Sequence, residues 1–201
     1  ASLLYTTVLF VVWDFSRYIM HRLMHAVPAL WAFHQVHHSA EVLTPLTFHR
    51  LHPVESVAYQ IRNILATGLV TGIFFWLFRG TVTDVTFLGV HALGLLFNVF
   101  TGNLRHSHVW IGFGRAEAWL VSPAQHQLHH SIAPEHYNCN YGTWLSLWDR
   151  LSGTLVLSAD EKPPAFGLTE ETRNHEQHLL SAWLHPFRAM LNIRIAPALL
   201  A

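Results

Sequence analysis

The feature that most constrains this chain is a histidine pattern that occurs twice. The segment HQVHHS covers residues 34–39, and HQLHHS covers residues 126–131, 92 positions later. Each segment places histidines at relative positions 0, +3 and +4. Residues three and four apart share one face of an α-helix. The spacing therefore predicts two short helices, each able to point its imidazoles at one place.

These histidines are candidate metal ligands, and a third set joins them. His21 and His25 are four residues apart, which again fits one helical face. Neutral imidazole suits iron, zinc, copper and nickel, but not magnesium or calcium. The three sets supply more ligands than one ion takes, so we expect two metal ions in one site. The candidates from the sets are His21, His25, His34, His37, His38, His126, His129 and His130, to which His52 and His106 can be added.

The competing interpretation is that histidines are simply abundant in this chain, which has 17, and lie at lipid headgroups. That interpretation does not explain why the two HxxHH patterns recur with an HxxxH pattern. His49, His108 and His136 are open between a supporting contact to the site and a place on the surface. His91 lies inside a long apolar segment, where a hydrogen bond between packed helices is expected rather than metal binding.

Long uncharged segments predict a membrane protein. Residues 63–78 hold 16 uncharged residues and residues 85–104 hold 20, with a polar turn at 79–84 between them. A helix that crosses a bilayer needs about 20 apolar residues. Only 12% of the chain is charged, whereas soluble domains average about 25%. We therefore expect a transmembrane hairpin, preceded by one helix over residues 2–25 that leaves the membrane near Arg17.

The hairpin decides where the histidines lie, because it returns the chain to the side that it left. The histidine segments precede and follow it, so they should share one side of the membrane. Of the twelve basic residues only Arg79 is at the hairpin tip, which predicts that the histidine side is cytoplasmic. The predicted fold is all-α: one domain over 1–201, an integral membrane helical bundle with a cytoplasmic histidine-rich helical cap.

Local signals place the expected helices. Ser122 to Gln125 has the form of a capping box with proline at the first helical position. Pro28 can start a helix through His38, and Pro53 one that runs into 61–78. The one candidate strand is 153–158, and residues 175–201 suggest a helix at the membrane surface.

Charge and cysteine content exclude other classes. Twelve Lys and Arg balance twelve Asp and Glu, which argues against a nucleic-acid partner. The single cysteine, Cys139, excludes internal disulfides and cysteine-rich zinc sites.

The histidine segments resemble those of a known family. HRLMH, HQVHHS and HQLHH are similar to the three histidine boxes of the fatty acid hydroxylase and sterol desaturase superfamily, the membrane-bound non-haem di-iron oxygenases. The similarity extends to RLHPVE, LRHSHVWI and NYGTWLSLWDRLSGT, and covers roughly residues 14–55 and 104–155. The family usually has further membrane helices before the first box, so this chain is expected to lack the front of such a protein.

The resemblance implies a centre of two Fe²⁺ ions on the eight box histidines, with His52 and His106 where the family has further histidines. It implies that a lipid is hydroxylated or desaturated with O₂, and that a separate reductase supplies electrons. Sterol, fatty acyl and ether lipids all remain open as substrates. The alternatives are a membrane metal-binding or metal-transport protein without redox chemistry, and a scaffold without activity. A transporter should bury ionisable residues in its spans, whereas the apolar segments hold only His91.

Carboxylates near the boxes are candidates for orienting the imidazoles and offsetting the charge of two cations. Asp14 precedes His21 and His25 on one helical face, at relative positions 0, +7 and +11. Glu55 follows His52 by three residues, and Asp149 lies in the closing block. The alternative role of each is a helix cap or a partner for an arginine.

Overall fold

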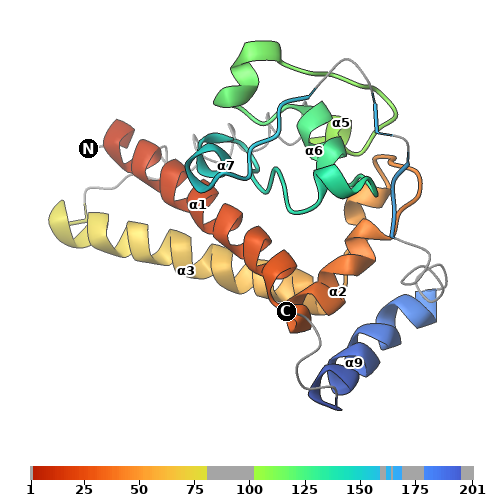
Figure 1. The fold of residues 1–201 in the computed structure, drawn as a ribbon. Coiled ribbons are helices and arrows are strands. Elements are labelled where there is room, and N and C mark those ends of the chain that lie inside the picture. The colour runs from red at the N-terminus through yellow and green to blue at the C-terminus, as the bar shows by residue number, and fades with distance from the viewer. Residues whose placement is uncertain (1, 81–101, 159–161, 164, 169–178, 196–201) are drawn as a thin grey trace.

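In a computed structural model, the described residues are 2–80, 102–158, 162–163, 165–168 and 179–195 (Figure 1). All the regular elements within these ranges are helices, so the expected all-α fold is confirmed. The main helices are α1 (Ser2–Ala26), α2 (Pro28–His38), α3 (Pro53–Leu77), α6 (Pro123–His129), α7 (Leu147–Ser152) and α9 (Leu179–Ile195). Shorter turns are η1 (Thr47–His49), α5 (Asn103–Arg105), η3 (Gly114–Ala118) and η4 (Pro134–His136).

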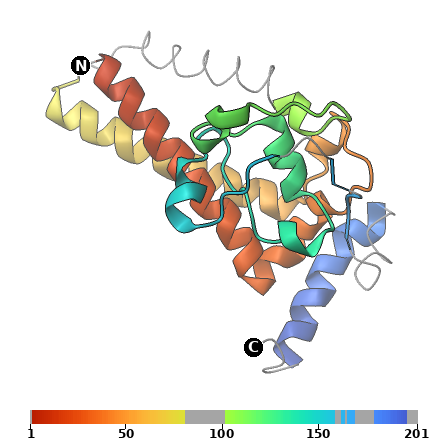
Figure 2. The same ribbon diagram turned by 45° about the horizontal axis from the view of Figure 1, so that its top comes forward.

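The two longest helices, α1 and α3, run antiparallel to each other. The Tyr5 and Thr71 hydroxyls lie 3.0 Å apart near one end, and the Trp13 indole N–H donates to Asn63 at 2.7 Å further along. Tyr5 also packs edge-on against Phe74, with ring centroids 5.3 Å apart. Figure 2 shows this pair extending away from the part of the molecule that contains α2 and α6.

Both helices of this pair are long and apolar enough to cross a membrane. Only 17% of the most apolar window of α3 is buried, which differs from the buried core helix of a soluble protein. α3 has 25 residues and begins at Pro53, so it is about 37 Å long at 1.5 Å per residue. The uncharged segment 63–78 is by itself shorter than a helix that crosses a bilayer. α3 is long enough because it starts earlier than that segment.

The hairpin expected over 61–104 is described only in its first arm. Residues 81–101, which include His91 and most of the second arm, lie outside the described residues. The main packing partner of α3 among the described residues is α1, whose residues 2–25 form the single helix that was expected. A single domain over 1–201 stays a prediction.

The histidine segments occupy helices whose starts follow the local signals. α2 begins with Pro28 in its first turn and ends at His38. In α6, the Ser122 hydroxyl accepts the Gln125 backbone N–H at 3.1 Å, while the Gln125 side chain accepts the Ser122 N–H at 3.0 Å. This reciprocal capping box satisfies donors that a helix start leaves unpaired. Both expected helices are confirmed.

The strand expected over 153–158 is wrong. The segment is extended, but its backbone groups pair with side chains rather than with a neighbouring strand. Val156 N–H donates to the Asn140 side chain at 2.8 Å, and Ser158 N–H donates to the Glu117 carboxylate at 2.7 Å. No second strand lies beside this segment in the described residues. Its residues favour an extended backbone, but the segment does not become part of a sheet.

The tail helix α9 packs on α2, with the rings of Phe33 and Phe187 5.3 Å apart. On the same helix Leu179, Leu180 and Trp183 are more than half exposed. This amphipathic arrangement fits a helix at a membrane surface, as the sequence suggested for this region.

Candidate metal centre

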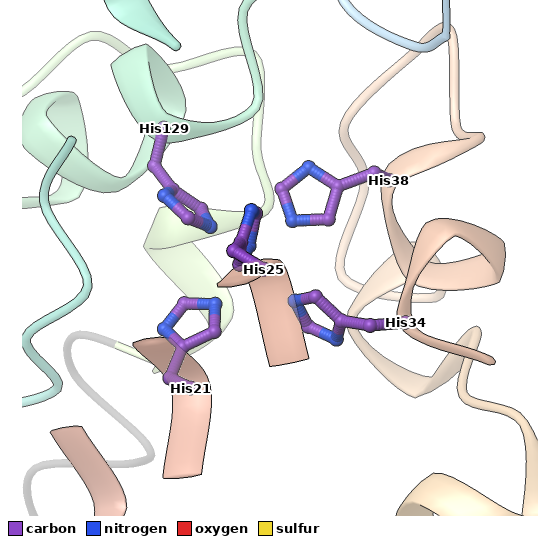
Figure 3. A group of neighbouring side chains, drawn as sticks. All are labelled: His21, His25, His34, His38 and His129. Carbon is purple, nitrogen blue, oxygen red and sulfur yellow. The ribbon is translucent and has the colours of Figure 1, made fainter. Parts of the chain in front are cut away.

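Nine histidines form two groups in which one ring nitrogen from each residue lies within 4.8 Å of the others. We call them the five-histidine group and the four-histidine group. The first consists of His21, His25, His34, His38 and His129, and the second of His37, His106, His126 and His130. Figure 3 shows the five-histidine group, with rings from α1, α2 and α6 turned toward one another.

The two HxxHH segments each divide between the two groups. In α2, the pair four residues apart, His34 and His38, joins the five-histidine group, while His37 joins the other. In α6 the assignment is reversed: His126 and His130 belong to the four-histidine group, and His129 to the first. Residues four apart on a helix align more closely than residues three apart. Each segment therefore gives a pair to one group and a single imidazole to the other.

Three members of the five-histidine group are held by their Nδ1 atoms. His21 Nδ1 lies 2.8 Å from the Tyr141 carbonyl oxygen, and His129 Nδ1 lies 2.6 Å from that of Cys139. A carbonyl oxygen can only accept, so Nδ1 carries the proton in both rings. The lone pair of Nε2 is then directed to the middle of the group.

The third held ring is that of His34, whose Nδ1 lies 2.8 Å from Glu55 Oε1. Both residues are almost fully buried. A carboxylate behind a ligating imidazole orients the ring and raises its basicity. The Nε2 atoms of His25, His34, His38 and His129 are buried and have no hydrogen-bond partner among the described residues. Unsatisfied buried nitrogens of this kind are costly unless a ligand completes them.

In the four-histidine group, ring nitrogens approach one another directly. His126 Nε2 lies 3.1 Å from His106 Nε2 and 3.2 Å from His130 Nε2. A neutral imidazole has one N–H, so His126 Nε2 cannot donate to both neighbours. Two nitrogens bound to one divalent ion at about 2.1 Å each stand about 3 Å apart when the bonds are perpendicular. The spacing fits ligands of a common ion.

Burial keeps these imidazoles neutral, which is the form that binds metal. Desolvation, together with the positive charge that neighbouring histidines would carry, lowers the pKa of His106 to about 2. It lowers the pKa of His37 to about 3. Desolvation also lowers the pKa of His129 to about 4, although the hydrogen bond to Cys139 opposes it. Protons therefore compete poorly for these nitrogens near neutral pH.

The two groups adjoin. The ring of His38, from the first group, stacks on that of His130, from the second, with centroids 4.3 Å apart. The rings of His34 and His37, which also belong to different groups, have centroids 5.5 Å apart. The arrangement is that of two neighbouring candidate ion sites in a buried interior, since His34, His38 and His130 are at most 4% exposed.

The expected carboxylates are placed differently from one another. Glu55 contacts an imidazole directly, as described above. Asp14 does not: its oxygens accept from the backbone of Trp144 and Leu145 and from the Trp148 indole, at 3.1, 3.2 and 2.8 Å. None of these three bonds goes to an imidazole. The buried carboxylate of Asp14 instead attaches α1 to the segment that leads into α7.

Asp149 acts through the backbone of the loop that holds two histidines. It accepts the N–H of Tyr141 at 2.9 Å and of Gly142 at 2.7 Å, and the Thr154 hydroxyl at 2.7 Å. A Cβ at Gly142 would lie 2.8 Å from the Leu145 carbonyl oxygen and 2.9 Å from the Asp149 carboxylate. The close approach of that carboxylate therefore requires glycine.

His52 is not brought to either group. Its Nδ1 accepts the Val54 N–H at 3.1 Å as the N-cap of α3, and its Nε2 lies 3.2 Å from the Trp183 carbonyl oxygen on α9. Both ring nitrogens are thus used in joining two helices. His106 does reach the centre. His49 and His108 are exposed, and His136 lies 3.0 Å from the Ser131 hydroxyl at the edge of α6.

Sequence reasoning missed two buried polar residues that support the site. Glu117 is fully buried, and its carboxylate accepts from Ser122 at 2.6 Å and from Ser158 at 2.6 Å. It thereby anchors the N-cap of α6. Asn140, in the loop that follows α6, makes three side-chain hydrogen bonds, one to Gln125 in α6 and two to Val156. Neither residue belongs to a spaced pattern, so neither had a signal beyond being polar between apolar neighbours.

Comparison with known proteins gives relatives that act on lipids by name. The chain is 28% identical over 176 residues to alkylglycerol monooxygenase from Xenopus tropicalis, covering 85% of this chain and 35% of that protein. It is 31% identical over 147 residues to ornithine lipid hydroxylase OlsE from Rhizobium tropici, covering 72% and 39%. Cholesterol 25-hydroxylase from Homo sapiens is 29% identical over 158 residues, covering 72% and 48%.

The chain thus spans between a third and a half of the length of these relatives. No solved structure matches it. The pattern that defines the fatty acid hydroxylase family matches residues 6–154, which include every member of both histidine groups. With three quarters of the sequence inside that match and the boxes folded into one buried cluster, the chain belongs to the fatty acid hydroxylase family.

Proposed function

We propose that this chain forms the metal-binding part of a membrane-bound di-iron oxygenase that hydroxylates a lipid with O₂. The observation that carries the proposal is the pair of adjoining buried histidine groups, nine imidazoles in all. The names of the relatives, which are hydroxylases and a monooxygenase of lipids, support hydroxylation rather than desaturation.

The donor set fits two divalent ions of the iron, zinc, copper and nickel class, because every donor is a neutral imidazole. The five-histidine group would hold one ion and the four-histidine group the other. His52 is left out, since both of its ring nitrogens are used elsewhere. When bound, iron supplies the O₂-dependent oxidation of an unactivated C–H bond, which no side chain provides.

The protein itself orients the imidazole rings, places a carboxyl group next to them and excludes bulk water. The carbonyls of Cys139 and Tyr141 and the carboxylate of Glu55 hold three Nδ1–H groups, so the opposite nitrogens face the centre. Two bound cations would favour the ionised form of Glu55, whose negative charge would offset part of theirs. Burial of the rings keeps bulk water away, which protects a reactive oxidant from side reactions.

A lipid substrate is supported by the surface of the α1 and α3 pair. Ile64, Leu65 and Leu69 on α3 are between 62% and 68% exposed, and large apolar side chains in such positions favour contact with acyl chains. We propose that the substrate reaches the centre from the bilayer. The ether-lipid, ornithine-lipid and sterol names of the relatives leave its headgroup open.

Two further parts of the proposal concern partners and orientation. The sequence carries no cytochrome, flavin or nicotinamide signature, so the electrons come from a separate reductase. The basic residues gather on the histidine side, which favours a cytoplasmic centre. Cysteines at Glu135 and at Arg79, in a Cys139→Ser background, should react with an impermeant maleimide from opposite faces of sealed vesicles. Reaction of the Glu135→Cys variant only from the outer face would reverse the orientation.

The central test is metal content together with oxygen use. The full chain, purified in detergent and loaded anaerobically with Fe²⁺, should retain two irons per chain. With a chemical reductant it should consume O₂ and transfer ¹⁸O to one of three lipids: an alkylglycerol, an ornithine lipid or cholesterol. Retention of metal without oxygen use on any lipid would favour the non-redox metal-binding alternative. Retention of less than one ion would contradict the centre itself.

A further inference from the structure

The loop of residues 139–142, which we call the carbonyl loop, fixes histidines from two different boxes. The Cys139 carbonyl accepts from His129 on α6, and the Tyr141 carbonyl accepts from His21 on α1. The two acceptors are two residues apart in one chain segment. Any change in the path of this loop therefore moves both acceptors, and with them two of the rings in the five-histidine group.

The residue between these carbonyls, Asn140, is the one most firmly attached to the rest of the cap. Its Nδ2 group donates to the carbonyls of Gln125 and Val156 at 3.2 and 2.9 Å, and its Oδ1 accepts the Val156 N–H at 2.8 Å. Its backbone N–H donates to the Thr154 carbonyl at 3.0 Å. It is 1% exposed, so losing the side chain would leave its buried partners without these bonds.

Asn140 also has an unusual backbone conformation. Its φ of 53° lies in the left-handed region, which asparagine tolerates better than most residues other than glycine. This turn aims the carbonyls on either side of Asn140 at two rings. A β-branched or bulky residue here would be strained, and glycine would keep the turn but not the side-chain hydrogen bonds.

We propose that Asn140 is a positioning residue for the five-histidine group: by fixing the carbonyl loop, it holds His21 and His129 with their Nε2 atoms toward the metal. The inference rests on the proposed two-metal centre. It assigns the loop a role toward one ion rather than toward both.

The selectivity follows from where the other group is attached. The hydrogen bonds of the four-histidine group go to the Thr47 hydroxyl, to the backbone of Arg50 and between the rings themselves. Among the described residues, none of these bonds involves the carbonyl loop. α6 keeps its own anchor in the capping box of Ser122 and Gln125. Loosening the loop should therefore leave the second ion in place.

The chain offers a matched control two residues away. Asn138 is also left-handed, with φ 59°, but its side chain is exposed and only accepts the Tyr141 hydroxyl at 3.1 Å. Asn138→Gly and Asn140→Gly thus make the same exchange of residue type in the same backbone region. Both add the same freedom to the unfolded chain, and only Asn140→Gly removes the bonds that fix the loop.

The test is a Co²⁺ titration of the metal-free full chain in detergent, followed by absorption spectroscopy and by elemental analysis after dialysis. Wild type and Asn138→Gly should each hold two ions with the same spectrum. Asn140→Gly should hold one ion as tightly as wild type and the other about 10–100-fold more weakly, the typical cost of losing support behind a ligand. Asn140→Asp, which keeps the acceptor but cannot donate to the two carbonyls, should show the same split.

If both Asn140 variants bound both ions more weakly, or bound both as tightly as wild type, the role of Asn140 would be overturned. A merely structural residue would affect both groups or neither. If Asn140→Gly fails to fold, the same criterion applies to Asn140→Asp. Wild-type protein with fewer than two ions would overturn the two-metal centre and this inference with it. That failure is recognised from the wild-type value alone.

Discussion

Residues 32–40 and 121–131 are all buried and hold six of the nine grouped histidines. The outer part of α3, residues 63–77, instead exposes most of its large apolar side chains. In a soluble protein this distribution would be reversed. The comparison teaches that the two regions face different solvents. Lipid is the expected surrounding of the α1 and α3 pair, while the imidazoles have neither lipid nor water and depend on one another, on backbone carbonyls and on metal.

The largest expected effect comes from removing a ring from the buried region. His130→Ala should lower turnover more than about 100-fold, since even the loss of a group behind a ligand costs about 10–100-fold. His108→Ala, at an exposed position, should keep turnover within about twofold. Product formation per chain at equal protein concentration is the measurement. Equal loss in both variants would mean general destabilisation instead of ligand removal.

Lowering the pH should destabilise the metal-free protein through the same buried region. The pKa of His37, His106 and His129 is lowered on folding, to about 3, 2 and 4, whereas an unfolded histidine has a pKa of about 6.5. Below pH 6.5 the unfolded chain binds more protons, so stability is present above that pH and is lost as pH falls toward the folded values. Between pH 7.5 and 5.5 the three together cost about 4 kcal/mol.

This loss should appear as a falling midpoint of thermal unfolding of the metal-free protein in detergent. A midpoint that stays level or rises between pH 7.5 and 5.5 would contradict the buried, neutral state of the rings.

A charge in the outer region tests the other side of the comparison. Leu69 on α3 is 62% exposed, and Leu151 on α7 is 73% exposed. If lipid surrounds α3 but not α7, Leu69→Arg should cost about 3 kcal/mol of membrane insertion, and Leu151→Arg close to nothing. The fraction of protein that stays in carbonate-washed membranes measures the difference. Equal retention of the two variants would place residue 69 in water or headgroups.

The smallest expected effect concerns Glu55, the carboxylate behind His34. Glu55→Gln keeps the shape of the side chain beside His34, but it removes the carboxylate that would carry a negative charge next to a bound ion. The affinity for one ion should fall about 10–100-fold, while thermal stability of the metal-free chain stays near that of wild type. Asp14→Asn, which contacts no imidazole, should leave metal affinity unchanged. A reversed outcome would restore Asp14 to the centre.

The sequence was most informative where chemistry is local. The start of α2 at Pro28 and the capping box of Ser122 and Gln125 were both predictable, because proline and short polar side chains act within one turn. Helical spacing also indicated which histidines could face one way. Nine of the ten proposed ligands lie together. His52 does not, because it is the N-cap of α3, a role that the sequence pattern did not distinguish from metal binding.

Tertiary partners were not predictable from spacing. Asp14 shares a helical face with His21, yet its carboxylate meets the backbone of Trp144 and Leu145, which only the fold brings there. The extended segment 153–158 failed as a strand for the same reason, since its partners are the side chains of Asn140 and Glu117. Propensity describes one segment, whereas pairing depends on which other segment arrives beside it.

The exchange of single imidazoles between α2 and α6 has a consequence for assembly. Any ion bound at either group would be a cross-link between segments about 90 residues apart in the chain. Closing a loop of roughly that length with a covalent bridge stabilises a protein by about 4–5 kcal/mol in the chain-entropy account. During synthesis, neither ion could find its full set of donors until residue 130 had emerged, so metal uptake would come late and would lock a fold whose two halves had already met.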